Sequence, residues 1–111
     1  MNVMFAVQIT EPAQDDIDRA FVWWSSRRSQ VEARKWYNEI HRAILTLKQM
    51  PERCPTVPES KLSVAGVRQL LFGVGTRPTH RIMFVVRSNT VIVLRVRHHS
   101  EGELAPFDIS S

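Results

Sequence analysis

The 111-residue sequence has little of several features that mark common classes of protein. It contains one cysteine, Cys54, so no disulfide can form within the chain, and we expect a reducing cytoplasm. No apolar run approaches the roughly 18–20 residues of a membrane span, and the first residues lack a secretory signal. Because glycine-rich phosphate loops and metal-ligand spacings of histidine and cysteine are also missing, we expect no cofactor and no metal.

Acidic residues are absent from one long stretch of the chain. Residues 61–100 contain none of the 11 Asp and Glu residues but seven of the 15 Lys and Arg residues. The net charge of +4 therefore arises in this part, since the remainder has more acidic than basic residues. A one-sided positive surface is typical of proteins that bind nucleic acid or an acidic protein segment. A solvated basic face that only maintains solubility is the other interpretation.

Hydrophobic periodicity predicts one α+β domain over residues 1–111. The expected order is β-α-α-β-β-β, with a helical hairpin packed on one face of a small antiparallel sheet. Apolar residues recur at three- and four-residue spacing in two segments, which places the hairpin at about 11–50. Runs rich in β-branched and aromatic residues place the strands at about 3–9, 67–73, 80–87 and 91–99.

Polar residues and prolines mark the breaks between these elements. Thr10 is a candidate N-cap of the first helix, and Ser29 of the second. Three prolines from Pro51 to Pro58 end the hairpin and predict an irregular connector. Residues 88–90, Ser-Asn-Thr, supply a turn, so the last two strands are expected to pair antiparallel.

Alternation along the last two strands separates their apolar and basic side chains. Strict period two puts a mainly apolar set on the face that the helices cover: Ile82, Phe84, Val86, Ile92, Leu94, Val96 and His98. The basic side chains then project together from the opposite face: Arg81, Arg95, Arg97 and His99. Since a sheet with helices on one side leaves its other face free, the sequence predicts a bare, cationic binding face.

Four residues outside this pattern are also of interest. Trp23 and Trp24 are adjacent on the first helix and about 100° apart, so they cannot both face the core squarely. Trp24 fits the apolar stripe, whereas Trp23 either contacts a partner or packs against the second helix. Arg68 opens a strand, where it binds phosphate or pairs with a helix carboxylate. His80, beside Pro78, is interpreted as a solvated loop residue.

The ordered series of motifs resembles the RelE/ParE superfamily of type II toxin–antitoxin toxins. The segment "ITEPAQDDID" is similar to the start of the ParE-type first helix, and "MPERCPTVPES" to the loop after the second. The segments "VRQLLFG", "HRIMFVV" and "VIVLRVRHH" resemble the successive strands, the last being close to the "VLRVxH" pattern of ParE-like and plasmid-stabilisation proteins. The resemblance covers nearly the whole chain. It implies a small cytoplasmic toxin that arrests growth when free.

The resemblance also implies partners. A cognate antitoxin wraps an acidic, amphipathic segment around such a toxin and connects it to operator DNA. ParE-like toxins poison DNA gyrase without recognised catalytic residues, and this is the first choice here. RelE-like toxins cut mRNA in the ribosomal A site, and an inactive module that still binds its antitoxin is a third reading. Residues expected to contact the target or the antitoxin are Arg68, Arg81, Arg95, Arg97, His98, His99 and Trp23.

The nuclease alternative assigns catalytic roles to three residues. Metal-free RNA cleavage uses the substrate's 2′-OH as nucleophile and needs a base, an acid and a cation for the phosphate. By resemblance to the YoeB type of mRNA interferase, Arg81 would stabilise the phosphate, His99 would be the general acid and Glu59 the base. The ParE-type pattern instead places the family histidine at His98.

Overall fold

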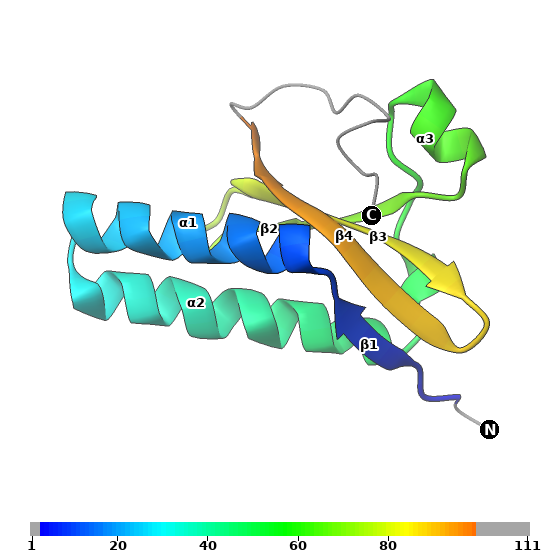
Figure 1. Cartoon of the computed structure of the whole chain (residues 1–111), viewed down its shortest axis with the longest axis horizontal. Helices are drawn as coiled ribbons and strands as arrows, with labels where there is room; N and C mark the ends of the chain where they lie inside the picture. Colours follow the sequence, from blue (N-terminus) through cyan, green and yellow to red (C-terminus); the bar gives the residue numbers. More distant parts are fainter. Residues whose placement is uncertain (1–2, 100–111) are drawn as a thin grey trace.

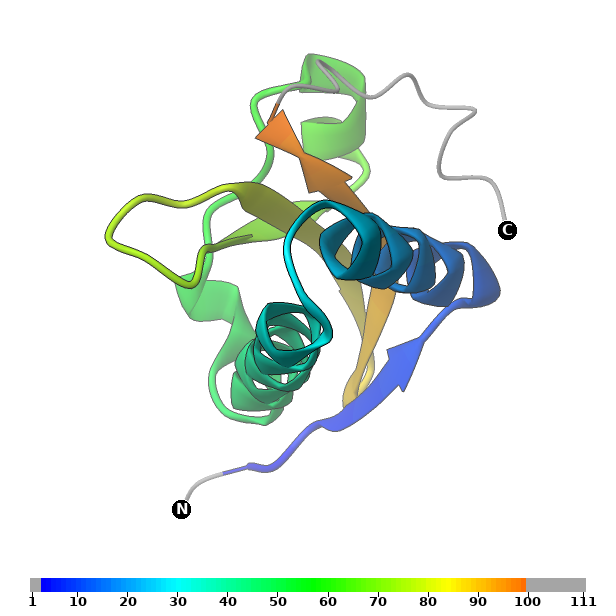
Figure 2. The ribbon, with the colours of Figure 1, turned by 90° about the vertical axis from the view of Figure 1, so that its left-hand side faces the viewer.

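The structure is a computed structural model, and it describes residues 3–99. Two long helices form an antiparallel hairpin on one face of a four-stranded sheet, which confirms the predicted fold class (Figures 1 and 2). No helix in the described part of the chain is long and apolar enough to cross a membrane. The elements are β1 (Ala6–Ile9), α1 (Glu11–Arg27), α2 (Gln30–Leu45), the 3-10 turns η1 (Thr46–Lys48) and η2 (Pro51–Arg53), α3 (Ser60–Val64), β2 (Arg68–Phe72), β3 (His80–Arg87) and β4 (Thr90–His98).

Side-chain caps define where the two long helices begin. The Thr10 hydroxyl accepts a hydrogen bond from the Ala13 N–H at 3.3 Å at the start of α1. The Ser29 hydroxyl accepts from the Glu32 N–H at 3.1 Å at the start of α2. Both bonds satisfy N–H groups that have no partner within the helix, and both predicted N-caps are confirmed.

The sheet is mixed, with strand order β1-β4-β3-β2. The pairs β2–β3 and β3–β4 are antiparallel, as the sequence predicts. At the edge, β1 pairs parallel with β4, from Ala6 opposite Thr90 to Ile9 opposite Val93. The Thr10 N–H then donates to the Val93 carbonyl at 3.1 Å, so the chain enters α1 directly beside β4.

A β-bulge reverses the alternation in part of β4. Leu94 has no residue opposite it, because the β3–β4 register shifts between Met83 and Phe84. Val91 and Val93 therefore face the helices, while Leu94 faces the other side. Strict alternation placed Leu94 on the helix face, and that prediction is wrong for the half of β4 before the bulge. One extra residue in a strand exchanges the faces of every side chain on one side of it.

The face of the sheet opposite the hairpin is also covered. The segment between α2 and β2 folds back across it and carries α3 (Figure 1). Val57, Leu62 and Val67 from this segment form a second core with Met83 and Val85 of β3. The prediction of a bare face is therefore wrong. The physical reason is that β3 is apolar on both of its faces, so both need cover.

The larger core lies between the hairpin and the sheet. It is formed by side chains that are almost fully buried, among them Ile17, Trp36, Ile40, Ile44, Phe84 and Val93. The spacing of the helical members is the three- and four-residue period seen in the sequence. This core fixes α1 against β4, and a groove opens beside that contact.

Candidate functional site

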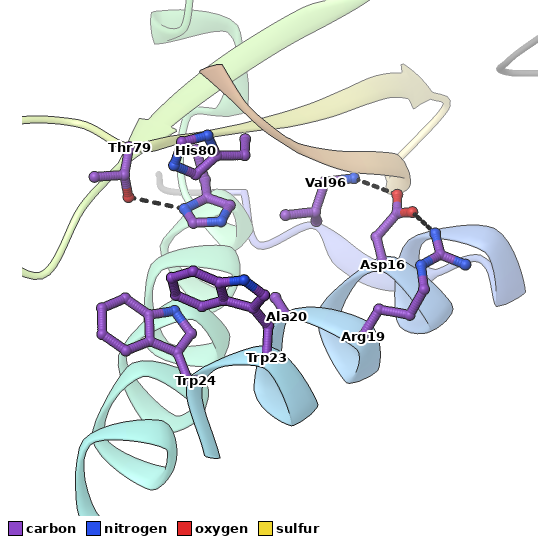
Figure 3. A pocket seen from close by; sticks show the side chains of 9 residues that line it. Asp16, Arg19, Ala20, Trp23, Trp24, Thr79, His80 and Val96 are labelled. Atoms are coloured by element: carbon purple, nitrogen blue, oxygen red, sulfur yellow. Dashed lines mark hydrogen bonds and ion pairs between the residues drawn. The ribbon is translucent and has the colours of Figure 1, made fainter. Parts of the chain in front are cut away.

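A groove with a volume of about 540 Å³ opens between α1 and the adjoining parts of β3 and β4 (Figure 3). It is lined by aromatic and aliphatic side chains with charged residues at its rim: Asp16, Arg19, Ala20, Trp23, Trp24, Thr79, His80, Val96 and His98. A concave, mainly apolar surface with a few polar groups is the usual form of a binding site.

Two tryptophans form one wall of this groove, below the His80 ring in Figure 3. Their rings meet edge to face, with centroids 5.6 Å apart. Trp24 packs against the larger core as its place in the apolar stripe predicts, whereas Trp23 is 49% exposed. The guanidinium groups of Arg27 and Arg28 lie 5.7 and 5.8 Å from the Trp23 and Trp24 ring centroids, respectively. Each indole of the wall thus has one guanidinium over its ring, and Arg27 lies over the exposed one.

His80 lies deeper in the groove and is only 6% exposed. Its ring centroid is 5.2 Å from that of Trp36 and 5.0 Å from that of His98, and its Nδ1 is hydrogen-bonded to the Thr79 hydroxyl at 2.8 Å. Burial, together with the positive charges of His98 and His99, lowers the pKa of His80 to about 4. The imidazole is therefore neutral at pH 7.

The interpretation of His80 as a solvated loop residue is wrong. His80 is the first residue of β3, and its ring faces the helices. The alternation of side chains along a strand could have placed His80 correctly. His80 stands two residues before Ile82 and four before Phe84, and both of these face the core under the helices.

Asp16 gathers four hydrogen bonds at the rim of the groove. Its Oδ2 accepts from Arg95 Nε at 2.7 Å and from the Val96 N–H at 2.9 Å. Its Oδ1 accepts from Arg95 Nη2 at 3.0 Å and from Arg19 Nη2 at 2.6 Å. The carboxylate thus pairs with the Val96 N–H just after the bulge, where β4 extends beyond its pairing with β1. The prediction that Arg95 projects from a bare face is wrong, because Asp16 holds its guanidinium against α1.

Asp16 was missed as a site residue, although the sequence holds a signal for it. It stands three residues after Ala13 and four before Ala20, on the apolar side of α1. An acidic residue in that position is buried, and a buried carboxylate needs a cation or several donors.

Arg81 and Glu59 form an ion pair on the opposite face of the sheet. Arg81 Nη1 and Nη2 donate to the two Glu59 oxygens at 2.9 and 2.7 Å, and Arg81 Nε donates to Gln69 Oε1 at 2.8 Å. The two side chains are only 10% and 6% exposed. The expectation that Arg81 projects into solvent is wrong, because the segment carrying α3 brings Glu59 over it.

The remaining predicted residues occupy different surroundings. Arg68 donates to the carbonyls of Glu52 and Cys54 at 3.2 and 2.6 Å, so it holds the connector instead of a helix carboxylate. Arg97 lies opposite Arg81 in the β3–β4 register and is partly buried. His99 is exposed.

The predicted contact residues therefore do not form one surface. Trp23 and His98 share the groove beside α1, whereas Arg81 and Arg97 lie in register on β3 and β4. Within residues 3–99, no group of three His, Cys, Asp or Glu side chains is arranged to hold a metal ion.

A helical hairpin over a mixed four-stranded sheet is the fold of the RelE/ParE superfamily of toxins. The chain is similar to the chromosomal ParDE toxin–antitoxin system of P. aeruginosa, with a TM-score of 0.69 and 22% identity over 86% of this chain and 96% of that chain. It is also similar to the toxin–antitoxin complex RelBE2 of Mycobacterium tuberculosis, with a TM-score of 0.50 and 20% identity over 86% and 92% of the two chains.

A sequence model of one family within this superfamily matches residues 7–102, and its description is the ParE toxin of the type II toxin–antitoxin system parDE. The chain therefore belongs to the ParE toxin family. No curated protein gives a significant match to it.

Proposed function

We propose that this toxin acts on DNA gyrase and is not an mRNA endonuclease. The observation that carries the proposal is the buried Glu59–Arg81 ion pair. An endonuclease of the YoeB type would need the Arg81 guanidinium to hold the scissile phosphate and the Glu59 carboxylate to take a proton. Here each group is the hydrogen-bond partner of the other, with both bonds shorter than 3.0 Å.

The ion pair weakens both catalytic assignments for physical reasons. A carboxylate that already accepts two bonds from a guanidinium is a poor proton acceptor, because the positive charge favours its ionised form. Separating the pair to admit RNA would leave two desolvated charges, at a cost of about 3–5 kcal/mol. Gyrase poisoning requires only a protein-binding surface, and the concave, mainly apolar groove beside α1 would supply one.

We also propose that a cognate antitoxin neutralises the toxin in the cytoplasm by placing an acidic, amphipathic segment in this groove. Apolar side chains of the segment would pack on Trp23 and Trp24. Its carboxylates would approach the guanidinium groups of Arg19, Arg27 and Arg28, which lie beside the groove or over its tryptophans. Operator DNA would be bound through the antitoxin.

The target is tested by inducing the toxin in cells, mapping RNA ends, and assaying purified gyrase. We expect inhibited supercoiling or double-strand breaks, and no mRNA cuts in the ribosomal A site. The exposed His99 gives the sharpest contrast, since His99→Ala should leave growth arrest intact. A-site cuts that disappear in His99→Ala would establish the nuclease instead. Harmless expression of the chain without any antitoxin would support the inactive alternative.

The groove is tested by binding the product of the adjacent reading frame to purified variants. Trp23→Ala should weaken binding by about tenfold or more, because a half-exposed indole in a groove is a typical hot spot. Val64→Ala is the matched control, since Val64 is 90% exposed on α3 at the other face. Equal affinities for the two variants would place the antitoxin elsewhere.

A further inference from the structure

β1 is the outermost strand on one side of the sheet. The Ala6 N–H donates to the Asn89 carbonyl at 2.9 Å, and the Thr10 N–H donates to the Val93 carbonyl at 3.1 Å. The even-numbered residues of β1 thus direct their backbone groups toward β4. Val7 and Ile9 direct theirs away from β4, toward the side where the sheet ends within residues 3–99.

The η1 segment covers the start of this edge, where the Phe5 N–H donates to the Lys48 carbonyl at 2.8 Å and Met4 forms a bridge with Gln49. Among the hydrogen bonds described for residues 3–99, none covers the outward N–H groups of Val7 and Ile9 in β1 itself. Edge strands are commonly guarded by charged residues, proline, a bulge or a covering loop. Residues 1–10 contain no charged side chain and no proline. At the opposite edge the covering contacts fall within the strand itself, because the Gln69 N–H of β2 donates to the Pro55 carbonyl at 3.0 Å and Thr56 forms a bridge with Arg68.

We propose that β1 pairs antiparallel with β1 of a second copy of this chain, about a two-fold axis at Gln8. In this register Val7 lies opposite Ile9 of the second copy, and each such pair exchanges both of its N–H···O bonds. Gln8 of one copy then faces Gln8 of the other at a non-hydrogen-bonded position, which is the narrow position because the two Cα atoms are closest there. The exposed side-chain amides can hydrogen-bond to each other at this position. The register is self-complementary, as a two-fold interface requires.

Charge favours a second copy over an acidic partner as the occupant of this edge. An acidic antitoxin segment gains no ion pair from a strand without cations, whereas an identical uncharged strand meets no repulsion. Exposed apolar side chains beside β1 would add contact area: Val3, Met4 and Met50 are 58%, 56% and 73% exposed. Met4 and Met50 lie together, because Met4 forms a bridge with Gln49.

The pairing would leave the groove accessible. Trp23 and Trp24 belong to the C-terminal half of α1, whereas β1 precedes the N-terminus of that helix (Figure 1). The resulting dimer has one continuous sheet and two grooves. This inference concerns assembly of the free chain, so it stands or falls independently of the gyrase target.

The test is sedimentation of the purified full chain over a wide range of concentrations. We expect the wild type to dimerise, and Gln8→Lys and Gln8→Glu each to weaken the dimer several-fold, because like charges meet on the axis. An equal mixture of the two variants should recover the dimer, which shows that each is folded. Val64→Lys is the control and should dimerise as the wild type does.

Cross-linking gives a second readout. Under mild oxidation Gln8→Cys should form a disulfide-linked dimer, because facing residues at a narrow position lie within disulfide reach. Val64→Cys should not, and the native Cys54 is buried. A monomeric wild type, or a dimer that neither Gln8 charge variant weakens, would overturn the proposal. So would a monomer whose antitoxin binding is weakened by Gln8→Lys, since the edge would then belong to the antitoxin.

Discussion

At the scale of single residues, two arginines of the sheet, Arg81 and Arg95, are held in ion pairs. Arg81 is bound by Glu59, and Arg95 by Asp16, in both cases through two hydrogen bonds. All four side chains are less than one fifth exposed. Because a desolvated charge is stable only beside a partner, these arginines hold segments of the fold together and are not a free cationic surface.

Replacing one member of the Glu59–Arg81 pair should lower the free energy of unfolding more than replacing both. Glu59→Leu and Arg81→Met should each lower the free energy of unfolding by about 3–5 kcal/mol, and the double variant should lose less than either. Urea denaturation measures these values. The exposed Arg42–Glu39 pair, with side chains 72% and 40% exposed, is the control, and Arg42→Met should cost less than about 1 kcal/mol. Equal losses at the two sites would contradict the role of burial.

His80 should make the protein less stable in acid. Its pKa falls from 6.5 in the unfolded chain to about 4 in the folded protein, so between these values the unfolded chain binds more protons. Stability from this residue is complete above about pH 6.5 and is lost as the pH falls toward 4, by on the order of 3 kcal/mol. Denaturation of wild type and His80→Phe from pH 7 to pH 4 measures the difference. Parallel profiles would refute this account.

At the scale of elements, α1 protects the part of β4 that lies beyond β1. Thr10 Oγ1 donates to the Leu94 carbonyl at 3.1 Å, and Asp16 accepts the next free N–H, that of Val96, at 2.9 Å. The start of α1 therefore takes the place of a neighbouring strand along the bulged half of β4.

Asp16→Asn should loosen this contact, because the amide keeps the shape of the carboxylate but not its charge. We expect the free energy of unfolding to fall by about 2–4 kcal/mol and the Val96 amide to exchange with solvent faster. Hydrogen exchange and urea denaturation measure the two effects. Asp18→Asn is the matched control, since Asp18 is exposed on the same helix and accepts only from Gln14 at 2.9 Å among the hydrogen bonds described. Unchanged exchange at Val96 would show that Asp16 does not hold the edge.

At the scale of the whole molecule, β3 connects two cores. Residues 80–85 are all buried, with Ile82 and Phe84 in the core under the hairpin and Met83 and Val85 in the core under α3. A strand with both faces buried couples the layers on either side of it, so we expect them to unfold together.

Substitutions in either core should therefore destabilise the whole domain. Ile40→Ala in α2 and Leu62→Ala in α3 should each lower the free energy of unfolding by about 2–5 kcal/mol, with a single transition by both circular dichroism and tryptophan fluorescence. Val64→Ala, at an exposed position of α3, should have little effect. Two separate transitions in Leu62→Ala would show that the α3 segment folds on its own.

Local features of the fold were predictable. The caps Thr10 and Ser29 and the periodicity of the hairpin depend on residues a few positions apart, and the structure has them where the sequence places them. The position of Trp23 beside the stripe left two readings open, contact with a partner or packing against the second helix, and only the structure shows that it is 49% exposed. The parallel pairing of β1 and the helix α3 were not predicted, since they depend on contacts with distant parts of the chain.

The sequence by itself determined the α+β class, the order of the two long helices and the four strands, the basic stretch and the resemblance to the RelE/ParE toxins, because these depend on periodicity, composition and motifs. Only the tertiary structure decided which charges remain available. Glu59 and Arg81 are 22 positions apart, and Asp16 and Arg95 are 79 apart, so no local pattern pairs them. The bulge at Leu94 likewise arises between strands, and it determines which side chains of β4 meet the helices.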